Sequence, residues 1–389
     1  MNKVSTLIIF VVLYFSFALQ AEEGLSAFQT WKAEPSSANA GLAFANALND
    51  QNAEQLEQLL NLDVLLSRTF SILGNPSGYK NMMKGAKQGL SENLYKTWFS
   101  LLEQSSGEAR YRRMINVDEQ DRALVMLDLG ESGVNYIELI FDTTEPGIVD
   151  FYTHSSGEKA SQSFAKVFGI VLPESSNFLK RLLGIKDIDK RVAETFKSVG
   201  VLNRQGRYEQ AYKKLKSLPK EIRDSRIIAL MLVFNSQNLE ESIYRKELAN
   251  LDKLYGDNED LFLMLMDHYF YTEQYDKGLV GLKKLNNRLG NDASVINMMS
   301  VFYFLKGDLK LATKQIDDAI MLEEMNEDHY WFKGDILNEQ GKFKELVQLF
   351  DLIESKFEVY IDPDELKAIE GYEKFSESKE FKQWKENKA

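Results

Sequence analysis

The sequence predicts a multidomain protein. In it, an N-terminal α+β domain, with helices followed by a four-stranded antiparallel meander, precedes an all-α array of helical repeats. Near Ala109 the apolar residues change from the three-and-four spacing of helices to the alternation of strands. In the C-terminal half, equivalent residues recur every 34 positions, which is typical of stacked helical hairpins. A chain of 389 residues is long enough for this arrangement.

The composition excludes several classes of function. The formal net charge is −12, whereas nucleic acids and anionic membrane surfaces both require a basic face. The chain has no cysteine, which excludes disulfides, thiol catalysis and thiolate metal sites. Because it also has only 3 histidines, we expect no metal site and no cofactor.

The first 21 residues have the pattern of a secretory signal peptide. Lys3 supplies a positive start, an apolar run follows from Leu7 to Leu19, and small residues precede Glu22. The run is shorter than the ~20 residues that a membrane-spanning helix needs, and an uncleaved anchor is the alternative. Either way we expect a periplasmic or secreted protein, with no integral membrane segment once the leader is removed.

Residues 25–165 form the predicted α+β domain. A helical stripe runs from Ala38 to Gln104, with Asn52 as a helix cap and a break at residues 75–78. Strands with alternating apolar residues then follow, joined by short turns. The four predicted strands centre on Ile115, Val125, Leu139 and Phe151.

This order of helices and meander resembles the NTF2-like fold, by topology only and over about 120 residues. Members of that fold often enclose a pocket, and some are enzymes. The candidate pocket residues are Glu138, Asp150, Tyr152 and His154. Together they could perform acid–base chemistry. We favour the alternative, that they form the solvent face of a half-exposed sheet, as antiparallel strands show by default.

Residues 166–191 form the predicted helical connector. An amphipathic stretch from Ser163 to Leu172, with Phe164 and Phe168, overlaps its start, and a second short apolar helix runs from Phe178 to Ile185. The connector is apolar enough to pack against both neighbours, so we expect no flexible linker. A membrane-interaction helix is the alternative.

Residues 192–389 form the predicted repeat array with a C-terminal cap. Gly278, Ala312 and Leu346 are each 34 residues apart, as are Leu282, Ile316 and Phe350, and Gly307 and Gly341 mark the same turn in two units. These residues resemble the tetratricopeptide (TPR) repeat family, which implies paired helices that stack into a superhelix with a concave groove. The proline that usually follows the second helix is missing in every unit, unless Pro219 is a shifted version of it. Asp362 and Pro363 predict the start of a capping helix.

The repeat phase predicts which side chains line the groove and contact a partner. They are Phe196, Asn203, Leu263, Asp267, Asn297, Phe304, Trp331, Asp335 and Asn338. The row mixes aromatic, amide and acidic groups, so it favours a basic or amide-bearing segment. The alternative for each residue is a solvated helix face or local packing.

Three functions compete at this point. The first is an exported, non-enzymatic scaffold that binds a peptide segment or partner subunit, such as an envelope protein, in the groove. The second is a small-ligand-binding or acid–base enzyme pocket in the N-terminal domain, with the repeats as a docking arm. The third is an architectural role in envelope assembly. We favour the first, because no nucleophile, phosphate-binding or zinc-protease motif occurs.

Overall fold

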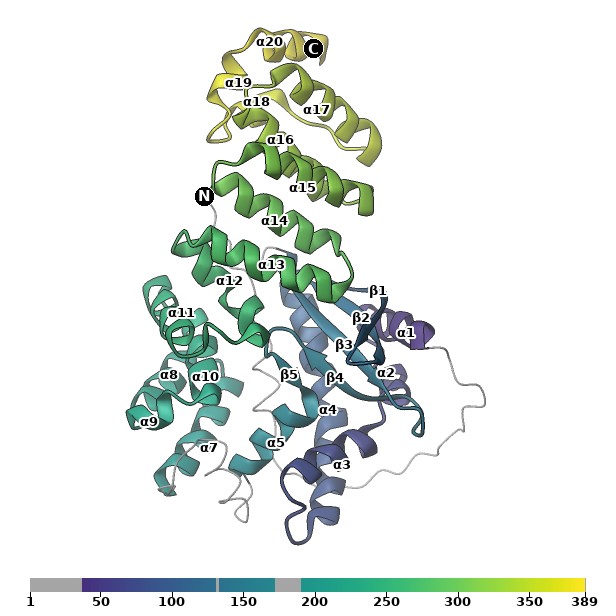
Figure 1. Ribbon diagram of the computed structural model, residues 1–389, viewed down its shortest axis with the longest axis vertical. Helices are drawn as coiled ribbons and strands as arrows, with labels where there is room; N and C mark the ends of the chain where they lie inside the picture. The colour runs from purple at the N-terminus through teal and green to yellow at the C-terminus, as the bar shows by residue number, and fades with distance from the viewer. Residues whose placement is uncertain (1–36, 131–132, 172–189, 389) are drawn as a thin grey trace. The chain divides into compact units, whose positions relative to one another are not determined.

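The computed structural model describes residues 37–130, 133–171 and 190–388. The chain divides into two compact units, Met1–Tyr271 and Thr272–Ala389 (Figure 1). The boundary falls inside the predicted repeat array, residues 192–389. The predicted leader and the second connector helix, residues 178–185, lie outside the described residues.

Four helices open the first unit, and their caps follow from local sequence. Asn52 precedes α2 and accepts a hydrogen bond from the backbone N–H of Gln55 at 3.0 Å, which confirms the predicted cap. Residues 75–78 separate the last two helices, as predicted. The helices are α1 (Ser37–Asn49), α2 (Ala53–Leu59), α3 (Leu62–Ile72) and α4 (Tyr79–Ser105).

An antiparallel sheet follows, with its strands in chain order. The four predicted strands are present, and a short fifth strand was not predicted. A two-residue loop joins the first two strands, with φ of 52° at Asp118 and 61° at Glu119, as in a tight hairpin whose twist matches the sheet. The strands are β1 (Glu108–Val117), β2 (Gln120–Asp128), β3 (Val134–Phe141), β4 (Ile148–Thr153) and β5 (Glu158–Lys159).

Helices cover one face of this sheet and form the core of the α+β domain. Trp98 of α4 meets Phe44 of α1 and Phe151 of β4, each with ring centroids 5.4 Å apart in edge contacts. Gly41 lets α1 approach the sheet closely, because a Cβ there would lie 2.7 Å from Ala123 Cβ. The α+β architecture expected for this region is therefore present.

The remaining described residues of the first unit are mainly helical. α8 packs on α7, and α11 packs on α10. Glu247 of α11 accepts hydrogen bonds from Tyr212 and Lys216 of α8, which joins the two hairpins. These elements are α5 (Ala160–Val171), α7 (Lys190–Arg204), α8 (Tyr208–Lys216), α9 (Lys220–Arg223), α10 (Arg226–Gln237), α11 (Glu241–Tyr255), the 3-10 helix η4 (Glu259–Leu261) and α12 (Phe262–Tyr271).

The second unit consists of helical hairpins and a cap. Three helices begin at Tyr275, Leu309 and Phe343, so the 34-residue step of the sequence is also a step of the structure. Asp362 accepts a hydrogen bond from Asp364 N, and Pro363 occupies the first turn, as predicted. The elements are α13 (Tyr275–Leu289), α14 (Ala293–Leu305), α15 (Leu309–Leu322), α16 (Glu327–Glu339), α17 (Phe343–Phe357), α18 (Pro363–Lys367), α19 (Glu373–Glu377) and α20 (Lys379–Lys388).

Candidate functional site

A charged cluster is buried on the sheet, on the face opposite the helical core. Glu138 of β3 lies between two basic partners: Arg122 Nη1 is 2.6 Å from Oε2, and His154 Nε2 is 2.8 Å from Oε1. None of the three side chains is more than 6% exposed. The expectation that this face meets solvent is therefore wrong, because sequence alternation separates two faces without saying what covers each.

The register of the sheet explains how the cluster assembles. Glu138 lies opposite Tyr152, and the backbone N–H of His154 bonds the carbonyl of Tyr136. Arg122 is a diagonal neighbour, two positions from Leu124, which lies opposite Glu138. Both oxygens of Glu138 have a cationic or imidazole partner, so the cluster is built as a charge network and not as an open general base.

Arg122 was not among the residues predicted for this site. It was predictable, because side chains alternate along a strand and Arg122 lies on the same face of β2 as Leu124.

The carboxylate of Asp150 binds the first turn of α5. Its carboxylate accepts hydrogen bonds from Ser161 Oγ at 2.6 Å and from Ser161 N at 3.1 Å, in the first turn of α5. Burial raises the pKa of Asp150, and the hydrogen bonds from Ser161 oppose that rise. Asp150 therefore helps to fix α5 on the sheet and is separate from the Glu138 network.

Tyr152 joins the sheet to the helical part of the first unit. Its hydroxyl donates to Asp260 Oδ1 of η4 at 2.8 Å, and Arg226 Nη2 of α10 donates to the carbonyls of Ser156 and Gly157. A Cβ at Gly157 would lie 2.2 Å from the carbonyl oxygen of Asp260. The four predicted pocket residues are thus buried and close in register, but Asp150 and Tyr152 are bonded to other elements.

Four predicted partner-binding residues lie in the first unit. Phe196 of α7 and Leu263 and Asp267 of α12 are buried, and Asn203 at the end of α7 is half-buried. Tyr244 of α11 donates to Asp267 Oδ2 at 2.9 Å. Burial raises the pKa of Asp267 to about 8, so this carboxyl is mainly neutral at pH 7.

The other five predicted partner-binding residues lie in the second unit, and all are half-buried. Phe304 meets Phe332 in an edge contact at 5.6 Å, and Trp331 packs on Phe350 at 5.9 Å. Asp335 accepts a hydrogen bond from Tyr372 Oη at 2.8 Å, and Asn338 Nδ2 donates to the carbonyl of Gly371 at 2.9 Å. Burial raises the pKa of Asp335 as well.

Three of these residues are asparagines with shielded amide atoms. Oδ1 of Asn203, Asn297 and Asn338 is buried without a hydrogen-bond partner among the described residues, and so is Nδ2 of Asn203. A shielded amide that forms no hydrogen bond costs about 1–3 kcal/mol. These amide atoms are therefore hydrogen-bond donors and acceptors for which the described residues supply no partner.

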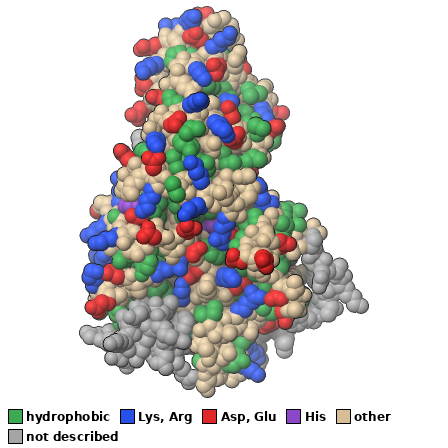
Figure 2. Space-filling view, in the orientation of Figure 1, with side chains coloured by type: hydrophobic (Ala, Val, Ile, Leu, Met, Phe, Trp, Pro, Cys, Tyr) green, Lys and Arg blue, Asp and Glu red, His purple; other side chains and the backbone are tan. Residues whose placement is uncertain are grey.

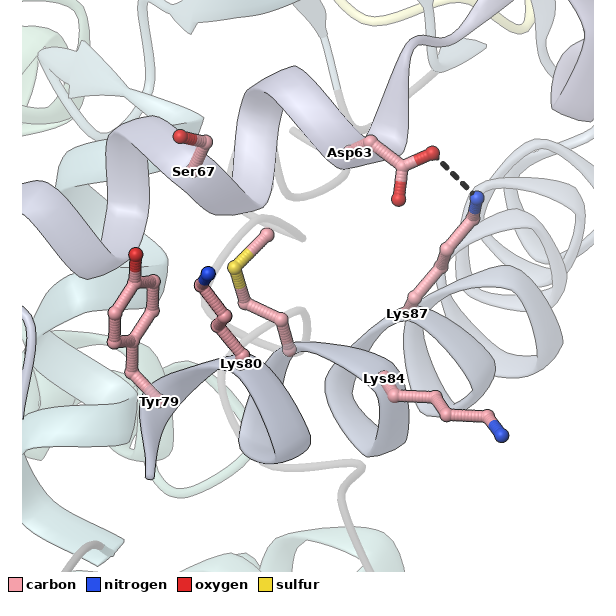
Figure 3. A pocket seen from close by; sticks show the side chains of 7 residues that line it. Asp63, Ser67, Tyr79, Lys80, Lys84 and Lys87 are labelled. Atoms are coloured by element: carbon pink, nitrogen blue, oxygen red, sulfur yellow. Dashed lines mark hydrogen bonds and ion pairs between the residues drawn. The ribbon is translucent and has the colours of Figure 1, made fainter. Parts of the chain in front are cut away.

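A separate pocket of about 530 Å³ lies between α3 and α4 (Figure 3). It combines lysine side chains with two hydroxyls, and it was not predicted from the sequence. The lining residues are Asp63, Ser67, Tyr79, Lys80, Met83, Lys84 and Lys87.

Within the described residues, no group of three or more His, Cys, Asp or Glu side chains is arranged to hold a metal ion. No helix in the described part of the chain combines the length and apolarity needed to cross a membrane.

Comparisons with known proteins show only a distant likeness. No family model and no curated protein matches the chain. The solved structure "MamA 41-end from Desulfovibrio magneticus RS-1" is 14% identical with a TM-score of 0.37, over 44% of this chain and 98% of that chain. A second, "MamA RS-1 ArsTM double mutant", is 13% identical with a TM-score of 0.36, over 44% and 97%. Likenesses at this level carry no inference about function.

Proposed function

We propose that this protein is a non-enzymatic scaffold whose helical repeats bind an extended peptide segment or a partner subunit. The observation that carries the proposal is that the shielded amide oxygens of Asn297 and Asn338, in the second unit, have no hydrogen-bond partner among the described residues; Asn203 of the first unit has such atoms as well. A peptide backbone presents both a donor and an acceptor at each residue, which is what a side-chain amide pairs with. The 34-residue step supports the assignment to stacked, TPR-like repeats that form a superhelix.

Access to these amides requires only a local change. All three asparagines are half-buried, so each side chain reaches the surface although its amide oxygen is shielded. The last torsion of an asparagine side chain is soft, so rotation can present the amide to a ligand. The hydrogen bond gained then offsets the cost of the unpaired atom.

The charge states of the two predicted aspartates limit which kind of segment would bind. The aspartates in the predicted row favoured a basic or amide-bearing segment, but Asp267 is mainly neutral at pH 7 and Asp335 is bonded to Tyr372. This weakens the preference for a basic segment and favours recognition through amides and apolar contacts.

Exposed apolar side chains in the second unit fit the same role. Met321 in the last turn of α15 is 77% exposed, and Met325 in the turn between α15 and α16 is 71% exposed. Figure 2 shows hydrophobic side chains gathered over α14 and α15, among interspersed acidic and basic ones. Exposed apolar groups of this kind often mark protein contacts.

The location of the scaffold is part of the proposal. The leader-like first 21 residues suggest export to the periplasm or secretion, with envelope proteins as partners. The competing idea of a ligand or acid–base pocket in an NTF2-like N-terminal domain is disfavoured, because Glu138 is already neutralised by Arg122 and His154.

The test uses single asparagine substitutions in the full chain. A pull-down from the envelope fraction identifies co-purifying proteins, and binding of the purified partner is then measured by calorimetry. We expect Asn297→Ala and Asn203→Ala each to weaken binding about tenfold. The matched control is Asn287→Ala, at an exposed position of α13. Trp331→Ala is less suitable because it also removes packing on Phe350.

Two results would overturn the proposal. One is a partner that binds both asparagine variants as tightly as the wild type. The other is a partner whose binding maps entirely to residues 37–171 by hydrogen exchange.

A further inference from the structure

The pocket between α3 and α4 has an uneven charge. Three lysines and one aspartate line it, and Lys87 Nζ pairs with Asp63 Oδ2 at 2.7 Å. Among the described residues, Lys80 and Lys84 form no ion pair. In a chain with a net charge of −12, this leaves a local excess of positive charge.

Lys80 also lies at the end of its helix where positive charge is least favourable. α4 is 27 residues long, and its first turn contains no acidic residue and receives no hydrogen bond from a capping side chain. The first N–H groups of a helix carry partial positive charge, so Lys80 beside them is electrostatically unfavourable. A bound anion would reverse the sign of that interaction.

The side chains in the pocket are arranged to donate hydrogen bonds. Figure 3 shows the hydroxyl of Tyr79 and the ammonium of Lys80 directed from α4 toward α3, where the hydroxyl of Ser67 lies. Lys84 extends away from the cleft. Tyr79 packs against Phe70 of the core, with ring centroids 6.1 Å apart, and this contact holds its ring in place.

Size and apolar lining add a second constraint on the ligand. A volume of about 530 Å³ is in the range of small-molecule sites. Met83 contributes an apolar, adaptable surface between the polar groups. A single inorganic ion would leave most of this space unfilled.

We propose that the pocket binds a small organic anion, in which a phosphate or carboxylate group is joined to a compact apolar body. Lys80 supplies the charge and Ser67 and Tyr79 supply hydroxyl donors, while Met83 and the tyrosine ring contact the apolar body. This site is independent of the repeats and of the peptide binding proposed above.

The test measures binding of two probes with the same ring, phenyl phosphate and benzoate, to the full chain by calorimetry at low and high salt. We expect saturable binding of at least one probe, weaker in high salt, and the comparison shows which anionic group is preferred. Lys80→Gln should reduce the affinity about tenfold, because it removes a charge-assisted hydrogen bond.

A matched control separates this site from general surface charge. Lys96→Gln removes an exposed lysine on the same helix, outside the pocket, and should leave binding unchanged. Circular dichroism checks that both variants fold. The proposal is overturned if neither probe binds saturably, or if the folded Lys80→Gln and Lys96→Gln variants lose the same affinity.

Discussion

The phenol of Tyr244 on α11 donates a hydrogen bond of 2.9 Å to Oδ2 of Asp267 on α12, and both side chains are buried. Burial is the main cause that raises the pKa of Asp267 to about 8, and the hydrogen bond from Tyr244 opposes the rise without cancelling it. A carboxyl group that keeps its proton near neutral pH couples the stability of this part of the first unit to pH.

We expect α11 and α12 to lose stability as the pH rises from about 4 to above 8. In this range the folded chain holds a proton that the unfolded carboxyl has released, so raising the pH favours unfolding. Asp267→Asn should remove the slope, because an amide does not titrate. The difference in the free energy of unfolding, Asp267→Asn minus wild type, should be at least ~1 kcal/mol more positive at about pH 9 than at about pH 5. Hydrogen exchange of the α11 and α12 amides measures the local stability at each pH. Equal slopes of this stability against pH in the wild type and in Asp267→Asn would contradict the prediction.

The buried pair of Arg122 and Glu138 gives a second prediction. Arg122→Met removes the guanidinium partner of Glu138, whose carboxylate stays buried beside His154, so we expect a loss of about 3 kcal/mol in the free energy of unfolding. Arg122→Met combined with Glu138→Leu should recover most of that loss, because no uncompensated charge remains. Denaturant titration of the three proteins measures the coupling.

A surface pair is the control for this experiment. Lys213 and Glu209 form an exposed ion pair on α8, and Lys213→Met should cost less than about 0.5 kcal/mol. A loss in Arg122→Met as small as this one would show that the buried pair is not required.

The contact between Gly278 and Phe302 gives a third prediction. A Cβ at Gly278 of α13 would lie 2.2 Å from Cε1 of Phe302 on α14. Gly278→Ala should therefore destabilise this helical hairpin by about 1–3 kcal/mol, although alanine favours helices. Hydrogen exchange of α13 and α14 is the readout. Gly85→Ala in α4 meets nothing within 4 Å and should be neutral or stabilising by up to ~1 kcal/mol.

Two glycines with left-handed backbone give the fourth prediction. Gly157 has φ of 63° and Gly206 has φ of 68°, but only Gly157 faces a neighbour, the carbonyl oxygen of Asp260. Gly206→Ala should cost about 1 kcal/mol from backbone strain alone. Gly157→Ala should cost more and should increase exchange in η4 as well as in β4. If the two substitutions cost the same, the close approach of the sheet to η4 contributes nothing.

Most elements of the fold were predictable because their signals are local. The change of apolar spacing at Ala109 separates helices from strands, and Asn52 and Asp362 cap the helices that they were expected to cap. The short strand β5 was missed because two residues are too few for an alternating pattern.

The candidate sites were less predictable. Sequence alternation placed Glu138, Tyr152 and His154 on one face but assigned that face to solvent, and it did not include Arg122. In the sequence, the lysines between α3 and α4 have the pattern of an ordinary solvent-exposed helix face, because the neighbouring residues do not show that another helix lies opposite. The partner-binding row stays a prediction, although its residues now have known neighbours.

By itself, the sequence determined the order of helices and strands, the 34-residue step and the helix caps, because apolar period and capping chemistry act over a few neighbouring residues. Only the tertiary structure decided which polar groups are buried and with what partners. Burial, the pKa of Asp267 and the pairing of Glu138 depend on side chains brought together from different helices and strands. Their energies follow from that shared environment and not from the local pattern.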